Sequence, residues 1–232
     1  MNKGNFYAGI CVMIGLIVGG MMIPRAVSVN RSFERTVNVK GLCEREVKAD
    51  KAIWPLVLKI GGNDMNAIYT KVNAQNETIK KFLLDGGIKA SEITESLSVS
   101  DKYTMDYNND RAQRYIVKSV ITVCTDNVDA VVALMARQNE LLLNGIALAQ
   151  EDWDNATEFS FEALNKIKPE MIEEATCNAR EVADKFAKDS NSKIGKIKNA
   201  TQGTFSITDR DSYTPYIKNV RVVTNVTYYL KK

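Results

Sequence analysis

The sequence predicts an α+β fold, in which three helices pack on a largely antiparallel sheet and an N-terminal membrane helix precedes them. Apolar and polar residues alternate in strand fashion along several runs, most clearly over 36–43 and 218–230. Between these runs, three segments carry apolar residues at helical spacing. Strand hairpins with interspersed helices indicate one α+β domain over 31–232. Residues 1–30 are expected to form a membrane anchor, or a signal segment, and a tether.

The N-terminal stretch 6–23 holds 18 residues without a charge. About 18 or more apolar residues indicate a membrane span, whereas the core of a signal peptide has only ~7–15. Small residues at Ala26 and Ser28 also suit a signal peptidase, so a cleaved segment is the alternative. Length favours an uncleaved anchor. The residues expected to form its apolar surface and its GxxxG pair are Phe6, Ile10, Ile14, Gly15, Gly19 and Ile23.

The first two strands are expected over 36–43 and 52–60, joined by a charged elbow. Pro55 in the second strand can donate no ladder hydrogen bond, so this strand is expected at an edge or with a bulge. Further strands are expected over 93–103, 115–124, 157–163, 194–207 and 218–230.

Capping signals bound the three helices. Asp64 can cap the first, which Gly87 ends, and Asp126 can cap the second, which Gly145 ends. The third is expected to begin near Pro169, because proline is favoured in the first turn. The apolar residues expected to bury one side of this third helix are Ile172, Ala175, Ala179, Val182, Ala183 and Phe186.

Composition argues against several functions. The chain is 45% hydrophobic and 25% charged with a net charge of +3, and it has no Arg/Lys-rich run with interleaved aromatics, so no nucleic-acid partner is expected. It contains no histidine, which removes the commonest general base and the commonest metal ligand. Cys43, Cys124 and Cys177 lack the spacing of a zinc site, and all three are expected as small buried residues. Cys43 and Cys124 could pair if their strands were neighbours.

Two segments resemble the SIMPL-domain family of exported bacterial proteins, and the resemblance covers residues 36–230. The first is "VNVKGLCEREVKADKA", similar to the family's valine-rich strand, glycine and V-x-P-D-x-A elbow. Val47, Asp50 and Ala52 match this elbow, and Ala49 replaces the proline. The second is "AREVADKFAKDSNSKIGKI", similar to the family's alanine-spaced helix that ends in G-x-x-LGK. Its matching residues are Ala179, Arg180, Ala183, Ala187, Lys193, Gly195 and Lys196, with Ile194 at the leucine.

Asn191 stands where the family places the glycine that ends this helix. Asparagine is the residue that tolerates left-handed backbone best after glycine. We therefore expect a left-handed conformation at Asn191.

The resemblance implies a mixed α/β protein of the bacterial envelope. Taken with the uncharged N-terminal stretch, we expect an inner-membrane protein with its domain in the periplasm, or, after cleavage, a periplasmic or outer-membrane associated one. Some family members look like hollow, channel-shaped oligomers and are associated with oxidative-stress defence. The family has no agreed catalytic residues, so the resemblance carries over no catalytic residue and no cofactor.

The candidate sites in the sequence also have structural explanations. The elbow charges from Glu44 to Lys51 alternate in sign, which suits a solvated strand edge that discourages further pairing. Asp106, Asn108 and Asp110 occupy calcium-loop positions, but Arg111 stands where that loop needs glycine, so no metal site is expected.

The loop "ITDRDSYTP" joins the last two strands and carries Asp209, Arg210 and Asp211 at its crest. Loops on rigid scaffolds often carry recognition, so these three residues are the expected contact surface.

The sequence therefore favours a non-enzymatic, membrane-tethered protein that assembles with copies of itself and supports envelope integrity or stress defence. The last strand, 218–230, is long and lightly charged, and as a free edge it would pair with another chain. A module that binds a peptide or a small ligand through its polar loops is the alternative. An enzyme is the third hypothesis, and the missing histidine and missing motifs count against it.

Overall fold

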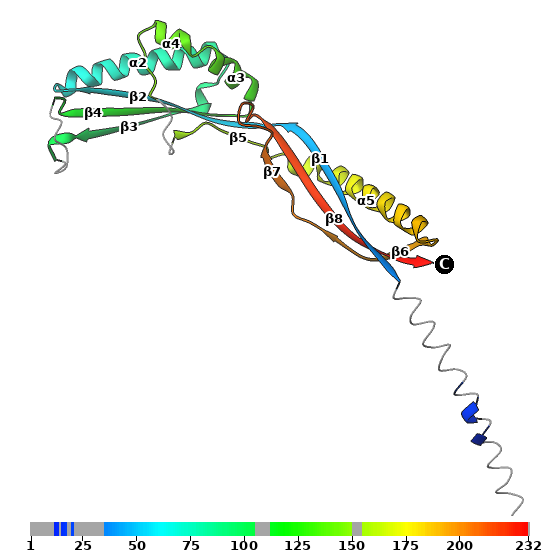
Figure 1. The fold of residues 1–232 in the computed structure, drawn as a ribbon. Coiled ribbons are helices and arrows are strands. Elements are labelled where there is room, and N and C mark those ends of the chain that lie inside the picture. Colours follow the sequence, from blue (N-terminus) through cyan, green and yellow to red (C-terminus); the bar gives the residue numbers. More distant parts are fainter. Residues whose placement is uncertain are drawn as a thin grey trace, which may run out of the picture. The chain divides into compact units, whose positions relative to one another are not determined.

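The strands form two antiparallel sheets, where the sequence predicted one (Figure 1). The computed structural model describes residues 12–13, 15–17, 20, 35–104, 112–149 and 155–231. The chain divides into two compact units, which we call unit 1 and unit 2. Unit 1 comprises 1–45, 167–206 and 221–232, and unit 2 comprises 46–166 and 207–220. The prediction of an α+β fold is confirmed, but that of a single sheet is wrong.

The sheet of unit 2 has the strand order β3-β4-β2-β5. β2 runs antiparallel to β4 along its whole length, from Ala52 opposite Thr125 to Gly62 opposite Tyr115. β5 pairs with only three residues of β2. The strands of this sheet are β2 (Lys51–Gly62), β3 (Ile93–Asp101), β4 (Tyr115–Thr125) and β5 (Glu158–Ser160).

Pro55 explains why β5 is short. β2 pairs with β5 only from Lys51 to Ile53, so Pro55 lies beyond this pairing and its missing N–H removes no bond from it. β2 is an inner strand, because β4 pairs with it on its other side, and its register with β4 is continuous, so the predicted edge position or bulge is wrong.

The helices of unit 2 begin and end close to the predicted signals. The carboxylate of Asp64 accepts the N–H groups of Asn66 and Ala67 at the start of α2, as expected. The cap of α3 is Asn127 rather than the predicted Asp126, because the Asn127 side chain accepts the N–H of Ala130. The predicted second helix is divided in two. The elements are α2 (Met65–Asp85), α3 (Val128–Ala136) and α4 (Asn139–Leu143), with single 3₁₀ turns at Ala90–Glu92 and Lys102–Thr104.

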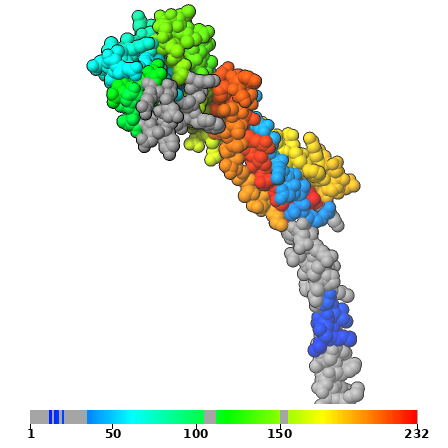
Figure 2. All heavy atoms as spheres, turned by 60° about the vertical axis from the view of Figure 1, so that its left-hand side comes forward, coloured from blue at the N-terminus to red at the C-terminus, as the bar shows by residue number. Residues whose placement is uncertain are grey.

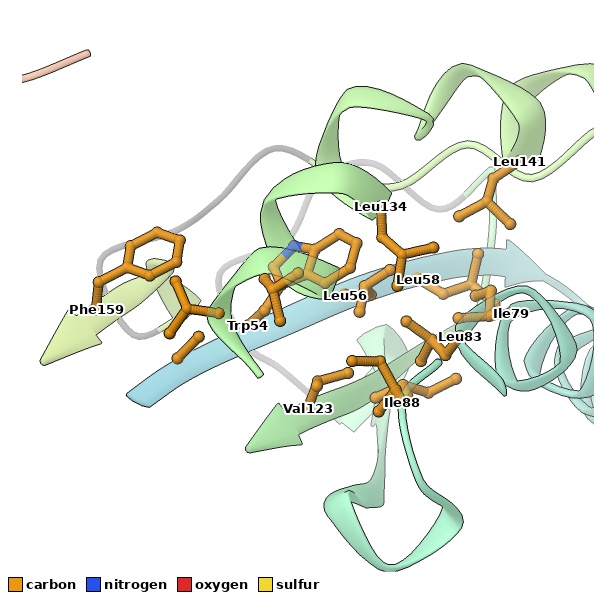
Figure 3. Close-up of a cluster of buried hydrophobic side chains, with 14 of the residues drawn as sticks. Trp54, Leu56, Leu58, Ile79, Leu83, Ile88, Val123, Leu134, Leu141 and Phe159 are labelled. Carbon is orange, nitrogen blue, oxygen red and sulfur yellow. The ribbon is translucent and has the colours of Figure 1, made fainter. Parts of the chain in front are cut away.

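The core of unit 2 lies between its sheet and these helices (Figure 3). Alternate residues of β2 point into it, and Trp54 and Leu56 are each 1% exposed. Ile79 and Leu83 of α2 and Leu134 of α3 close over them. This large apolar cluster holds the sheet and helices of unit 2 in fixed positions.

The sheet of unit 1 has the order β1-β8-β6, and β7 also pairs with β8. β8 therefore lies between two neighbours, and the prediction that the last strand is a free edge is wrong. Figure 2 shows β1 (blue) and β8 (red) side by side at the surface of unit 1. The strands are β1 (Thr36–Lys48), β6 (Lys193–Gln202), β7 (Ser206–Asp209) and β8 (Ile217–Lys231), of which β1, β7 and β8 also supply residues to unit 2.

α5 (Leu164–Asp189) begins five residues before Pro169, so the predicted start is wrong and the proline lies inside the helix. The predicted buried residues also need correction, because Val182 is 36% and Phe186 56% exposed. The residues that α5 does bury are spaced four apart: Met171, Ala175, Ala179, Ala183 and Ala187.

Gly41 of β1 explains why alanines fill this row. A Cβ atom on Gly41 would lie 1.8 Å from the carbonyl oxygen of Ala175 and 2.8 Å from the Cβ of Ala179. The helix and the strand therefore approach so closely that only glycine fits on one side and alanine on the other. The side-chain amide of Asn178 donates to the Leu42 carbonyl at 2.8 Å and holds this contact.

α5 ends as predicted. Asn191 has φ 49°, the left-handed conformation expected at this position. The N–H of Ser192 donates to the Ala187 carbonyl at 2.8 Å, which satisfies one of the last carbonyls of the helix.

The predicted anchor lies almost entirely outside the described residues. Of its six predicted positions only Gly15 is described, and it is helical. Phe6, Ile10, Ile14, Gly19 and Ile23 fall outside the part of the chain that the structure describes. Within that part, no helix is both long enough and apolar enough to cross a membrane.

Candidate functional site

The elbow charges hold structural elements together. The Asp50 carboxylate accepts the N–H groups of Glu162 and Ala163 at 2.7 and 2.8 Å, immediately before α5 begins. Lys51 pairs with the Glu162 carboxylate at 3.2 Å, and Lys48 pairs with Asp129. Asp50 thus fixes the start of α5, which explains why this helix begins before Pro169.

The remaining elbow charges are paired as well. Glu44 contacts Arg221 at 3.4 Å, and Arg45 contacts Glu170 at 2.9 Å. These pairs lie at the surface, where an ion pair contributes about 0–1 kcal/mol. The arrangement supports the scaffold interpretation of the elbow, although the charges bind other elements instead of remaining solvated along an edge.

The predicted contact loop uses its charges to hold its own backbone and to bind neighbouring residues, including Glu46 of the elbow, which pairs with Arg210 at 3.5 Å. The Asp211 carboxylate accepts the N–H groups of Tyr213 and Thr214 at 2.8 and 2.7 Å and the hydroxyl of Thr214. The pKa of Asp211 lies well below its ordinary value. The hydrogen bond from the Thr214 hydroxyl is the largest cause, and the one from the Arg210 guanidinium is the second. Asp209 pairs with Lys218, whose side chain is nearly buried. Asp209, Arg210 and Asp211 therefore shape the loop.

Tyr213 is the residue that this loop presents, and the sequence analysis missed it. Its side chain is 94% exposed, whereas the backbone beneath it is held by Asp211. A rigidly held aromatic side chain can bury a large area at a small cost in conformational entropy. The pattern of an aspartate two residues before a tyrosine in a turn was the available signal.

β3 forms one edge of the sheet of unit 2 in the part of the chain that the structure describes. Among the described residues β3 pairs only with β4, in a continuous register from Ile93 opposite Val123 to Asp101 opposite Tyr115. Residues 94–99 are all exposed, and Leu97 and Val99 are 44% and 51% exposed. The segment between Glu95 and Asp101 carries no charge and no proline. It lacks the features that usually protect an edge strand from pairing with another chain.

Side chains of α2 fix the position of β3. The buried side-chain amide of Asn76 in α2 donates to Glu95 at 2.7 Å and to the Ser119 hydroxyl at 2.9 Å. Lys80 of the same helix pairs with Glu95 at 2.7 Å, and its hydrogen bond is the main cause of the lowered Glu95 pKa. The network links α2, β3 and β4, so the exposed edge is preorganised.

The three described cysteines are free thiols. Cys43 lies in β1 and Cys124 in β4, which belong to different sheets, so the pairing considered from the sequence is wrong. Cys43 is buried as expected, but Cys124 and Cys177 are exposed. Burial, reinforced by Glu174, raises the pKa of the Cys43 thiol to about 11.

Metal ligands do not gather in the described part of the chain. Within it, no group of three or more acidic or cysteine side chains is placed to hold a cation. Asp106, Asn108 and Asp110, which resemble part of a calcium loop, lie outside the described residues.

The fold and the two motif segments define an α+β chain in which a β1–β2 elbow, closed by Asp50, and an alanine-rich helix pack on antiparallel sheets. The family model described as "SIMPL: Protein of unknown function (DUF541)" matches residues 37–227. The chain therefore belongs to the SIMPL family. No curated protein matches the chain.

Proposed function

We propose that this SIMPL protein is a non-enzymatic, membrane-tethered component of the bacterial envelope that assembles with copies of itself. The observation that carries self-assembly is the exposed segment of β3 between Glu95 and Asp101, which has no charge and contains Leu97 and Val99. The sequence suggested β8 as the strand that pairs with another copy, but β8 lies between β1 and β6, so we assign this role to β3.

Two copies of β3 would pair antiparallel about a two-fold axis, because identical chains usually satisfy such a surface by closed symmetry. With Leu97 opposite its own copy, Glu95 faces Val99, and the carboxylates of Glu95 and Asp101 stay apart. Each copy would gain a strand partner, and the Leu97 side chains would lose contact with water. A ring needs a second contact, which the outer edge of β1 at the end of its sheet would supply.

Light scattering on the detergent-extracted full chain tests self-assembly. The wild type should exceed the monomer mass of 25.9 kDa, after subtraction of detergent, at tens of micromolar. Leu97→Lys with Val99→Lys should reduce the mass to that of a monomer, because charges on an edge strand oppose pairing. Leu84→Lys, at an exposed leucine on α2, is the matched control and should leave the mass unchanged. A monomeric wild type would contradict the proposal.

The SIMPL resemblance supports the hollow, channel-shaped form of the assembly and its role in envelope integrity or stress defence. A strain that lacks the protein should be more sensitive to peroxide, and the chain with Leu97→Lys and Val99→Lys should fail to restore resistance. If this variant restores peroxide resistance, the cellular role does not depend on assembly through β3.

An uncleaved N-terminal anchor in the inner membrane, with the domain in the periplasm, is the location that we propose. The uncharged stretch 6–23 supports it, and so do the exposed side chains of Val12, Met13, Leu16 and Ile17, which are in helical conformation. N-terminal sequencing of the mature protein should begin at the start of the chain. A mature protein beginning at Val29 would instead indicate a cleaved segment and a periplasmic or outer-membrane associated protein.

A peptide- or small-ligand-binding module is the second candidate, and the exposed Tyr213 on its rigid loop favours it. Native mass spectrometry of the protein purified from the envelope should then show a bound peptide or small molecule. Tyr213→Ala should lose it, while Tyr69→Ala, at an exposed tyrosine on α2, should keep it. The absence of any bound species on the wild type would exclude this candidate.

A further inference from the structure

β6 begins and β8 ends at the same end of unit 1 (Figure 1), and four lysines lie in these parts of the two strands. β6 begins at Lys193, and its partner directly across the ladder is Lys231. Lys196 and Lys198 follow within the same strand, and all four side chains are exposed. We call Lys193, Lys196, Lys198 and Lys231 the basic surface.

None of the described carboxylates neutralises the basic surface. Like charges directly opposite each other in an antiparallel pair are destabilising, so Lys193 opposite Lys231 is unfavourable for the fold alone. Among the described residues, no carboxylate lies within ion-pair distance of these four lysines, whereas Arg45 and Arg221 of the same unit are both paired. An external anion would relieve this repulsion.

An aromatic ring accompanies these lysines. The Lys198 ammonium lies 5.7 Å from the centre of the Tyr229 ring. Tyrosine is enriched where proteins meet the headgroup region of a membrane, because its ring is apolar and its hydroxyl is polar.

The N-terminal segment joins unit 1 at this same end. The N–H of Leu230 donates to the Arg35 carbonyl at 2.8 Å, and the Arg35 guanidinium donates to the Ser192 hydroxyl at 3.1 Å. Both partners adjoin the basic surface in sequence. Residues 24–34 connect Arg35 to the uncharged stretch and can span at most about 40 Å. If that stretch crosses a bilayer, the lysines stay within reach of its headgroups.

Charge is also distributed unevenly between the units. Unit 1 has more basic than acidic residues, and unit 2 has more acidic than basic residues. An anionic membrane surface would therefore attract unit 1 and not unit 2.

We propose that the basic surface binds the phosphate headgroups of anionic phospholipids in the membrane that holds the anchor. This inference rests on the proposed N-terminal anchor and adds a second, electrostatic contact with the membrane. The contact would hold unit 1 against the bilayer and restrict the orientation of each copy.

Lysine acetylation of the full chain in nanodiscs tests this. Nanodiscs of phosphatidylcholine alone are compared with nanodiscs that also contain phosphatidylglycerol, and mass spectrometry follows each lysine. Acetylation of the basic surface should be roughly fivefold slower with the anionic lipid, in line with the contribution of one lysine near such a surface. High salt should abolish the difference, because it screens the attraction. Lys71 and Lys81, exposed on α2, should react equally in both.

The outcomes separate the two proposals. A chain retained in the neutral nanodiscs, with the same lysine reactivity in both lipids, overturns the lipid contact and leaves the anchor standing. A chain that does not stay with neutral nanodiscs overturns the anchor and, with it, this inference. Equal protection by inorganic phosphate without lipid would identify a free anion as the ligand and overturn the membrane contact.

A matched pair of variants removes the remaining ambiguity. Lys196→Glu with Lys198→Glu should abolish protection of Lys193 and Lys231 in the anionic nanodiscs. Lys71→Glu with Lys81→Glu changes the net charge equally and should preserve it. Equal effects of the two variants would mean that net charge, and not this surface, is responsible.

Discussion

Replacing Gly41 with alanine tests the contact that positions α5 on its sheet. The new Cβ would lie 1.8 Å from the Ala175 carbonyl oxygen, and ordinary contact begins at 3.4 Å. The helix backbone must therefore retreat by more than an ångström. Overpacking costs about 1–3 kcal/mol, and because the obstacle is backbone we expect the upper end, about 3 kcal/mol. The melting temperature should fall by roughly 6 °C or more.

Thermal and urea unfolding followed by far-UV circular dichroism measures this effect. Gly62→Ala is the matched control, since its Cβ meets side-chain atoms, Cδ1 and Cγ1 of Ile68, both at 3.2 Å, and no backbone atom. The control should cost less than about 1 kcal/mol. Adding Ala179→Gly to Gly41→Ala should not restore stability, because it removes a Cβ and leaves the Ala175 carbonyl in place. Equal stability of Gly41→Ala and Gly62→Ala would refute the close approach.

Three further changes test local features. Asn191→Gly should be neutral or stabilise by a few tenths of a kcal/mol, whereas Asn191→Val should cost ~1 kcal/mol or more at a φ of 49°, and equal melting temperatures would contradict this. Because the Lys80 hydrogen bond lowers the Glu95 pKa, the stability it provides is present above the unfolded pKa of about 4.3 and is lost as pH falls through the folded value. In the Glu95→Gln variant, the urea midpoint of unfolding should therefore decrease less on acidification than in the wild type. An equal decrease in both proteins would count against the network. With its pKa raised to about 11, the buried Cys43 should resist alkylation at neutral pH while the exposed Cys177 reacts, and equal native-state rates would contradict the burial.

Local signals in the sequence predicted much of the fold. Asp64, Gly87 and Asn191 act through their own backbone neighbourhood, and each ends or begins a helix as expected. The pairing of strands is not local, because the partner of β1 is β8 at the opposite end of the chain. Alternation shows that a strand has two faces, but not which strand lies beside it. The sequence therefore could not show that β1 and β2 enter different sheets.

The prediction of which α5 residues are buried was wrong for a related reason. Helical spacing allowed Val182 and Phe186 on the buried side, and hydrophobicity ranks them above alanine. The approach of Gly41 requires small side chains, so the alanine row faces the sheet and Phe186 is exposed.

Little of the candidate site could be predicted. Asp209, Arg210 and Asp211 were identified as a loop, but their bonds to the loop backbone, to Lys218 and to Glu46, which leave Tyr213 as the exposed residue, depend on the folded turn. The edge of β3 depends on the strand order of unit 2, which no local pattern encodes.

Thiol cross-linking tests most directly whether the chain assembles through β3. Leu97→Cys is placed in a chain whose own cysteines are replaced by alanine and is oxidised in intact membranes. Opposed residues of an antiparallel pair have Cα atoms about 4.5–5.5 Å apart, within the range that a disulfide accepts. We predict a covalent dimer from Leu97→Cys and none from Leu84→Cys at the exposed end of α2. Monomer alone from Leu97→Cys would contradict assembly through β3.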